Sequence, residues 1–317
     1  MSTVERQWAG EVITEPCLLR DMPLTVYHGT PCDGPAMSSS GLRTIAAQSP
    51  AHYWVTSPHN VARVEAEQKD AFNFGSAAHC LLLGEAGFRE KYAVRPEEFS
   101  DWRKAAAKQW RDEMIDAGRV VITPGQVEAI RGMAEALAAD PLVQAGLLNG
   151  RVERSIFWRD AVTGLWLKAR PDVLPEGDGM VADYKSTTDA SPEAVQRAIV
   201  NYGYAMQLAL IGEGLKQVAG VEMTDAVLVF QEKAPPFAVN VVIVEQEWIG
   251  WARRQLRRAV DTAARCFESG EWPSYPGEKH AFIPDWLRKR FEHHEQIGLL
   301  PSYGLGESVP ANDQSQA

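Results

Sequence analysis

The sequence predicts an α/β fold in which one mixed β-sheet is flanked by helices. Three observations lead to this prediction. The chain has a helical hydrophobic period up to about residue 145, alternation with a period of two within about 152–187, and then helices that alternate with two further strands up to about residue 268. With 317 residues, 45% of them hydrophobic, the chain is long enough to bury a large core.

The N-terminal part is predicted to be irregular at first and then helical. Residues 1–36 are expected to be irregular because proline and glycine occur close together near their end. A serine-capped short helix follows and stops at Ser49-Pro50, and residues 72–83 have the composition of a buried helix. Two amphipathic helices are predicted over 100–118 and 124–139, the second with proline at its first position. The helical part therefore covers about 37–145.

The central segment predicts a group of strands. Two strands joined by the turn "AVTG" make a hairpin, and a third strand follows the glycine-rich turn "PEGDG". A long helix over about 192–215, two more strands and a helix over about 246–268 complete a sheet core over about 150–270. We expect one domain over 37–300 and a disordered tail over 301–317, which has little apolar surface to bury. The strand segments are, in order, "VERSIFWRD", "LWLKARPDVL", "GMVADYKST", "DAVLVFQE" and "FAVNVVIVE".

Charge and cysteine content limit the possible functions. The formal net charge is -10, so a nucleic-acid site would have to be a local basic patch on an acidic protein. The chain starts without a basic and apolar leader and has no apolar run of about 18 residues, so we expect a soluble, cytoplasmic protein with no membrane partner. The cysteines have no metal-type spacing and indicate reduced structural thiols; they are Cys17, Cys32, Cys80 and Cys266.

Charged residues inside the third strand indicate chemistry. Asp183 and Lys185 are two apart, so they share one face of the strand, and buried charges are costly unless paired or bound to a metal. Asp172 follows Pro171 and approaches Asp183 if the two segments pair antiparallel across the glycine-rich turn. Two carboxylates with a lysine suit phosphodiester hydrolysis at Mg²⁺ or Mn²⁺, the lysine orienting the attacking water or offsetting charge. The alternative, an ion pair at a strand edge, stays open.

The motif "RPDV", followed about ten residues later by "ADYKST", resembles the PD-(D/E)XK nuclease superfamily. Four more segments occur in the order seen in RecE-type exonucleases (exonuclease VIII-like), relatives of the RecB nuclease domain; the resemblance runs from about Ser38 to about Trp286. It implies a restriction-endonuclease-like mixed sheet core with an N-terminal helical part. The four segments are "SSSGLRTIAAQSPAHYW", "FGSAAHCLLLGE", "VERSIFWRDAVTGLWLKARPDVL" and "YGYAMQLAL".

The resemblance also implies an activity and partners. These are Mg²⁺-dependent, 5′-to-3′ digestion of linear double-stranded DNA from its ends, with Mn²⁺ as a possible substitute, and a 3′ single strand passed to an annealing protein in phage or prophage recombination. A ring-shaped homo-oligomer around the duplex is implied as well. Two alternatives stay open: a catalytically inactive module that binds DNA ends on the same fold, and a structure-specific endonuclease on the same core.

Site residues are carried over from the resemblance position by position. Asp172 and Asp183 become metal ligands, together with His79 and the backbone carbonyl of Tyr184, and Lys185 becomes the catalytic lysine. For His79, a satisfied core histidine is the alternative, although Gly75 one turn earlier would let its helix approach the sheet.

Two further residues near the metal follow from the same resemblance. Glu153 becomes an outer or alternate metal carboxylate, with an exposed strand glutamate as the alternative. Gln207 is placed near the metal and the DNA. The family has a tyrosine one turn after this glutamine, and this chain has Ile211 there, so either Tyr204 substitutes or that DNA contact is absent.

Candidate DNA contacts are less specific. Ser186 and Thr187 either donate to a phosphate or end the strand. A first basic cluster lies beside Trp102 and Trp110 on one predicted helix face, where a solvated amphipathic face is the alternative. A second cluster lies on the helix over 246–268, with DNA, a neighbouring subunit or solvent as its possible partner. The clusters are Lys104, Lys108 and Arg111, and Arg253, Arg254, Arg257 and Arg258.

Overall fold

The computed structural model describes residues 5–64, 75–80, 88–99, 101–175, 179–275, 277–302 and 304–306. The chain divides into two compact units, Met1–Ser274 and Tyr275–Ala317. The first unit holds the sheets and the candidate site. It therefore includes the segment before residue 37 and ends earlier than the expected domain boundary at 300.

The described residues of the first unit form two five-stranded sheets and a two-stranded one, where the sequence predicted one mixed sheet. The first five-stranded sheet has the order β1-β2-β7-β8-β3, with β7 and β8 forming the predicted antiparallel hairpin. The prediction that residues 1–36 are irregular is wrong, because the apolar run "CLLR" forms β2, whose first three residues are buried against β7. The bounds are β1 Arg6–Gln7, β2 Cys17–Arg20, β7 Ser155–Arg159, β8 Trp166–Ala169 and β3 Ala36–Ser38.

The second five-stranded sheet carries the candidate site. Its order is β12-β11-β10-β9-β6, with β10 parallel to β11 and antiparallel to β9. The segment over 165–174, predicted as one strand, divides into β8 and β9 in different sheets. Pro171 stands at the break and has no backbone N–H to continue a ladder. The bounds are β12 Val239–Ile243, β11 Ala226–Glu232, β10 Val181–Thr187, β9 Val173–Pro175 and β6 Gly150–Val152.

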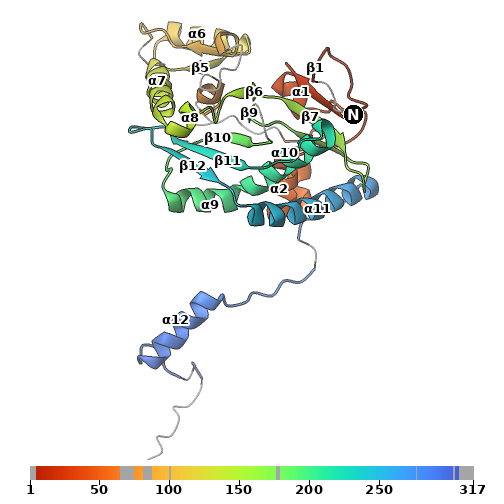
Figure 1. Cartoon of the computed structure of the whole chain (residues 1–317). Helices are drawn as coiled ribbons and strands as arrows, with labels where there is room; N and C mark the ends of the chain where they lie inside the picture. The colour runs from red at the N-terminus through yellow and green to blue at the C-terminus, as the bar shows by residue number, and fades with distance from the viewer. Residues whose placement is uncertain are drawn as a thin grey trace, which may run out of the picture. The chain divides into compact units, whose positions relative to one another are not determined.

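Helices cover one face of this sheet (Figure 1), and a large cluster of buried hydrophobic residues lies between these helices and the sheet. The helices α2, α10 and α11 contribute buried residues to it, and its sheet side includes Leu228 and Phe230 of β11. The predicted helix over 192–215 is two helices, because Gly203 adopts a left-handed conformation with φ +63° between α9 and α10. The bounds are α1 Leu24–His28, α2 Ser39–Ala47, α3 Pro50–Thr56, α9 Pro192–Tyr202, α10 Tyr204–Ala219 and α11 Gln246–Ser269.

The other face of the sheet packs against α7. Ile130 and Met133 of α7 share a buried cluster with Tyr184 of β10 and Val229 of β11. The predicted start of α7 is confirmed, with a capping box in which Thr123 and Gln126 bond each other's backbone N–H. The predicted helix over 100–118 is shorter, and the part expected to be helical also holds the parallel pair β4 and β5. The bounds are α5 Phe88–Lys91, β4 Tyr92–Val94, α6 Ala105–Asp116, β5 Val120–Ile122, α7 Pro124–Ala139 and α8 Pro141–Gln144.

Two predicted segments lie partly outside the described residues. Of the buried helix expected over 72–83, residues 75–80 are described and are helical. Of the tail expected over 301–317, only 301–302 and 304–306 are described, and they contain no helix or strand. The second unit has one helix in its described part, α12 Asp285–Gln296, which has no buried residue. In the part of the chain that the structure describes, every helix is too short or too polar to cross a membrane.

Candidate active site

Asp183 lies at the centre of β10 and is completely buried. Its side chain lies on the α10 side of the sheet, where Gln207 Nε2 donates to Asp183 Oδ1 at 2.9 Å. The Lys185 ammonium forms an ion pair with Asp183 Oδ2. Strand alternation therefore places both charges on one face, as predicted. The intervening Tyr184 lies on the α7 side, and its hydroxyl donates to Gln231 Oε1 at 2.7 Å.

Asp172 is held beside β10 by the backbone. It lies in the break between β8 and β9, and the backbone N–H of Tyr184 donates to Asp172 Oδ2 at 2.8 Å. Pairing of β9 with β10 at Val173 and Ala182 fixes this position. The predicted antiparallel approach of the two aspartate segments is thus present, made by β9 and not by an extension of β8.

His79 joins this group from the helical segment 75–80. Its Nε2 lies 3.1 Å from Asp172 Oδ1. The segment approaches β10 closely, since a Cβ built at Gly75 would lie 3.3 Å from Ser186 Oγ. The expected role of Gly75 in bringing its helix to the sheet agrees with this geometry. The histidine is three-quarters buried and contacts carboxylates, which differs from a purely apolar core setting.

Glu153 lies next to His79 and Asp172 and has a backbone conformation that the sequence did not predict. The sequence placed it on a hairpin strand, but it lies between β6 and β7 with φ +56°, a left-handed value that is uncommon for a residue with a side chain. Its backbone N–H donates to Asp172 O at 3.1 Å. The Glu153 carboxylate pairs with Arg170 and lies 3.7 Å from His79 Nδ1.

The donor set fits a divalent cation. One ligand atom each of His79, Glu153 and Asp172 lie within 4.8 Å of one another, and carboxylate oxygens with an imidazole can hold Mg²⁺ or Mn²⁺. Asp183 is outside this trio. Among the described residues, its buried Oδ2 makes no hydrogen bond and has the Lys185 ammonium as its ion-pair partner.

The charges of the group shift one another's pKa values. Burial raises the pKa of Asp183, and the neighbouring charge of Asp172 raises it further. Burial opposes ionisation of Asp172 too, but His79 and Lys185 outweigh it and lower the pKa of that carboxyl. Burial likewise opposes the charge on His79, yet Asp172 and Glu153 raise its pKa to about 9. Strongly shifted carboxyl pKa values in one cleft are typical of a functional site.

A cavity of about 230 Å³ opens beside these residues. Asp172, Glu153 and Gln207 line it, and so does Ile211, which is buried where the resemblance expects a tyrosine. Tyr204 instead lies next to the lysine, with its ring centroid 5.1 Å from Lys185 Nζ.

Sequence reasoning missed the arginines around this cavity. Arg170 bonds Met22 O and Ser155 Oγ as well as Glu153. It directly precedes the Pro-Asp pair, which was the signal that could have identified it. Arg43, from the serine-rich start of α2, lines the same cavity.

The other predicted DNA contacts have different surroundings. Thr187 Oγ1 donates to Asp189 O at 3.1 Å, which favours a role in ending the strand. Ser186 lies beside the segment of His79. Lys104 and Lys108 are exposed at the start and on the surface of α6. Arg111 pairs with Asp112, and the rings of Trp102 and Trp110 stack at 6.4 Å.

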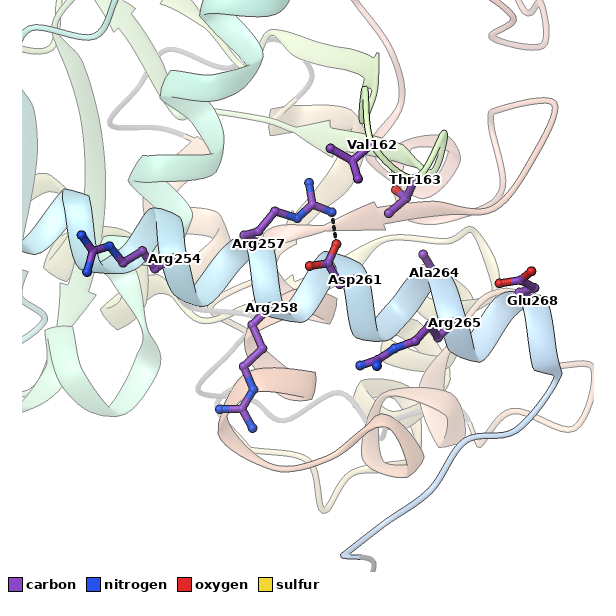
Figure 2. Close-up of a pocket in the computed structure, with 9 residues that line it drawn as sticks. All are labelled: Val162, Thr163, Arg254, Arg257, Arg258, Asp261, Ala264, Arg265 and Glu268. Carbon is purple, nitrogen blue, oxygen red and sulfur yellow. Dashed lines mark ion pairs between the residues drawn. The ribbon is translucent and has the colours of Figure 1, made fainter.

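The second arginine cluster lies along α11 (Figure 2). Arg257 forms ion pairs with Asp160, in the turn between β7 and β8, and with Asp261, so it ties the helix to the hairpin. Arg254 lies over the ring of Trp251 on the same helix. An open groove of about 850 Å³ runs beside these residues, and its lining also includes Arg258, Arg265 and Glu268.

Comparisons with known proteins show what the chain is similar to. The family model described as "PDDEXK-like domain of unknown function (DUF3799)" matches residues 38–283. A solved structure from Eubacterium rectale, described as "Putative exonuclease", is similar with a TM-score of 0.57 and 13% identity, covering 94% of this chain and 99% of that chain. A phage related exonuclease from Haemophilus somnus 129PT has a TM-score of 0.33 and 11% identity, covering 74% of this chain and 96% of that chain.

Among proteins with curated functions, none matches the chain in sequence. The likeness to the Eubacterium rectale structure is one of fold alone. The predicted fold class, an α/β fold with a mixed sheet core flanked by helices as in PDDEXK-like nucleases, is confirmed, although the strands form more than the one sheet that was predicted.

Proposed function

Because the chain belongs to the family of PDDEXK-like domains, we propose that it is a metal-dependent exodeoxyribonuclease that hydrolyses linear double-stranded DNA. One observation carries the proposal: Asp183 and Lys185 of β10 form an ion pair, and Asp172 and His79, from two other segments, are brought next to β10. The name of the Eubacterium rectale structure, which describes an exonuclease, supports an exonuclease over other nucleases.

In this proposal the carboxylates and the imidazole hold the metal. Asp172 and His79 provide ligand atoms, with Asp183 and the backbone carbonyl of Tyr184 beside them, and Glu153 is the alternate carboxylate. The ion, when bound, would polarise the phosphate and lower the pKa of a bound water. Mg²⁺ is the proposed ion and Mn²⁺ its substitute, because both prefer oxygen donors.

The other polar residues of the site either offset negative charge or hold the carboxylates in position. The Lys185 ammonium, buried against Asp183, offsets negative charge that develops on the phosphate and orients the attacking water. Gln207 fixes the Asp183 carboxylate by its hydrogen bond to Oδ1. Arg170 holds the Glu153 carboxylate in place, and the left-handed backbone at Glu153 directs that side chain toward His79.

The finer parts of the proposal rest on the family resemblance. They are 5′-to-3′ polarity, delivery of a 3′ strand to an annealing protein in phage or prophage recombination, and a ring-shaped homo-oligomer. With a net charge of -10, DNA must be held by local basic groups such as the arginines of α11 and the basic residues of α6. We place the protein in the cytoplasm, where its free, buried cysteines would stay reduced.

The test is digestion of linear duplex DNA labelled at either its 5′ or its 3′ end, with Mg²⁺ and with EDTA, beside a covalently closed circle. We expect release of the 5′ label with Mg²⁺, an intact circle and no reaction in EDTA. Cutting of the circle would favour a structure-specific endonuclease. No cleavage with Mg²⁺ or Mn²⁺ would favour the inactive DNA-end-binding module, which the isoleucine at 211 supports.

Variants connect the activity to the site. We expect Asp183→Ala and Lys185→Met each to reduce cleavage by at least about 10²-fold, because Asp183 helps to hold the metal and Lys185 offsets negative charge on the reacting phosphate. Asp225→Asn is the control, since this exposed residue directly precedes the neighbouring strand β11. Circular dichroism and melting temperature establish that the variants fold. Full activity of Asp183→Ala would remove this carboxylate from the mechanism.

A further inference from the structure

A groove of about 420 Å³ lies next to the candidate active site, between α2 and the junction of α9 and α10. We name it the tyrosine groove. Its volume is within the roughly 300–1,000 Å³ of small-ligand sites. Its lining residues are Ser40, Arg43, Thr44, Ala46, Ala47, Gln48, Val200, Asn201, Tyr202, Gly203, Tyr204, Met206 and Gln255.

The tyrosine groove adjoins the cavity beside the candidate active site, which we name the catalytic cavity. Ser40 and Arg43 line both spaces. Tyr204 lines the groove, and its ring centroid lies 5.1 Å from Lys185 Nζ and 5.6 Å from the centroid of the Tyr202 ring. A polymer that occupied both spaces would therefore contact Arg43.

The groove presents an exposed aromatic ring. Tyr202, at the end of α9, is 63% exposed as a residue, whereas Tyr204 packs against the buried Phe230. The backbone between them holds this arrangement. Gly203 has φ +63°, and a Cβ there would lie 3.1 Å from Arg43 Cδ, so glycine permits both the sharp junction and the close approach of the arginine.

Arg43 adds a positive charge that forms no ion pair with a carboxylate among the described residues, although the charge of the buried Asp183 acts on it from a greater distance. Its guanidinium donates to two backbone carbonyls, Tyr202 O at 2.6 Å and Ser39 O at 3.3 Å, which hold it between the groove and the cavity. Backbone carbonyls position a guanidinium without cancelling its charge. An exposed ring beside such a cation is the combination that binds a nucleotide, the ring stacking on the base and the cation pairing with the phosphate.

We propose that the tyrosine groove is a nucleotide subsite, in which a base close to the cleaved bond stacks on Tyr202 and the adjoining phosphate pairs with Arg43. The subsite rests on the proposed nuclease function and names how that site holds its substrate. Because every base has an aromatic face, the stacking contact selects for an unpaired nucleotide and not for a base sequence.

The experiment uses the full chain and duplex DNA with 2-aminopurine at the first, second or third nucleotide from the 5′ end, in EDTA so that no cleavage occurs. Stacking on a tyrosine quenches 2-aminopurine fluorescence. We expect the wild type to quench one of these positions. Tyr202→Ala should abolish that quenching and weaken DNA binding by about ten-fold, the size of one stacking contact. Tyr202→Phe, which keeps the ring, should retain both.

The matched control is Tyr275→Ala, a tyrosine with a similar exposure of 60% in the other unit, which should quench and bind as the wild type does. Wild-type quenching and affinity in Tyr202→Ala, while the enzyme digests DNA, would overturn the subsite alone. No quenching by the wild type at any of the three positions would overturn it as well. A wild type that neither binds nor cleaves DNA would overturn the subsite together with the proposed function.

Discussion

At the scale of single residues, Lys168 shows how a buried charge can be structural. It lies on β8 with 3% of its surface exposed, and its Nζ donates to Tyr27 O at 2.6 Å and Gly29 O at 3.1 Å. These carbonyls belong to the C-terminal end of α1, where a cation is favourable. Burial nevertheless lowers the pKa of Lys168 to about 8 from an ordinary value of 10.5.

This shift predicts a pH dependence of stability. A lowered pKa means that the unfolded chain holds the proton more tightly, so protonation favours unfolding. The contribution of Lys168 to the free energy of unfolding should be smallest below about pH 8. It should rise as the pH increases from about 8 to about 10.5. The free energy of unfolding of the wild type, relative to Lys168→Met, should therefore increase by about 3 kcal/mol across that interval.

Urea unfolding of both proteins at a series of pH values between 7 and about 10.5 measures this difference. The difference between the two free energies of unfolding isolates the effect of Lys168, because both chains share every other titrating group. A difference that stays constant over the interval would show that Lys168 keeps its ordinary pKa, despite its burial.

Single residues of the site also differ in whether their position could be predicted from the sequence. Asp183 and Lys185 could be placed on one face because strand alternation depends only on local geometry. The Glu153 and Arg170 pair could not, because it depends on a left-handed backbone at Glu153 and on two segments 17 residues apart. A resemblance gave Glu153 a role, and only the three-dimensional structure gave it a partner.

At the scale of elements, small residues set how closely α10 lies on the first sheet. A Cβ built at Gly214 would lie 2.6 Å from Trp158 Cζ3 and 3.2 Å from Ile156 Cγ2, both buried side chains of β7. This helix also carries Tyr204 and Gln207, so its distance from the sheets determines where those side chains meet β10.

We expect Gly214→Ala to lower the free energy of unfolding by about 1–3 kcal/mol, because the added methyl group overlaps the Trp158 ring. The loss should occur although alanine is the better helix former by about 1 kcal/mol. Gly250→Ala in α11 is the matched control, since a Cβ there meets no atom within 4 Å.

Urea or thermal unfolding compares the two glycine variants with the wild type. The control should be neutral or stabilised, because it gains helix propensity without a clash. Equal stabilisation of both variants would mean that α10 can move away from Trp158 at little cost, and that its position is not fixed by packing at this glycine.

At the scale of the whole molecule, the fold class was predictable but the division into sheets was not. Hydrophobic periods identify strands and helices because they reflect which face is buried. They do not say which strands pair, and a proline between two apolar segments can end a ladder or merely bend it. The break at Pro171, which separates β8 from β9, was therefore visible only in the structure. Strand β2 was missed because its four residues are too few to show a period.

The buried core lies within the first unit. The described hydrophobic side chains that are buried run from Ile13 to Cys266, and none belongs to α12. The last contact of this core is Trp272, whose ring stacks on Trp54 at 4.5 Å and contacts Phe267 at 4.9 Å. A chain that ends after Ser274 keeps these contacts.

We therefore expect residues 1–274 to fold on their own, with a melting temperature within about 2 °C of the full chain, because the deleted unit contributes no buried residue in its described part. Truncation after Gly270 is the matched control. It also removes Trp272 and should lower the melting temperature by about 3–6 °C, the effect of losing one aromatic contact of about 1–2 kcal/mol. Differential scanning calorimetry of the three chains measures both effects. If the chain ending at Ser274 melted as low as the one ending at Gly270, residues after 274 would have to stabilise the first unit, and the core would extend beyond Trp272.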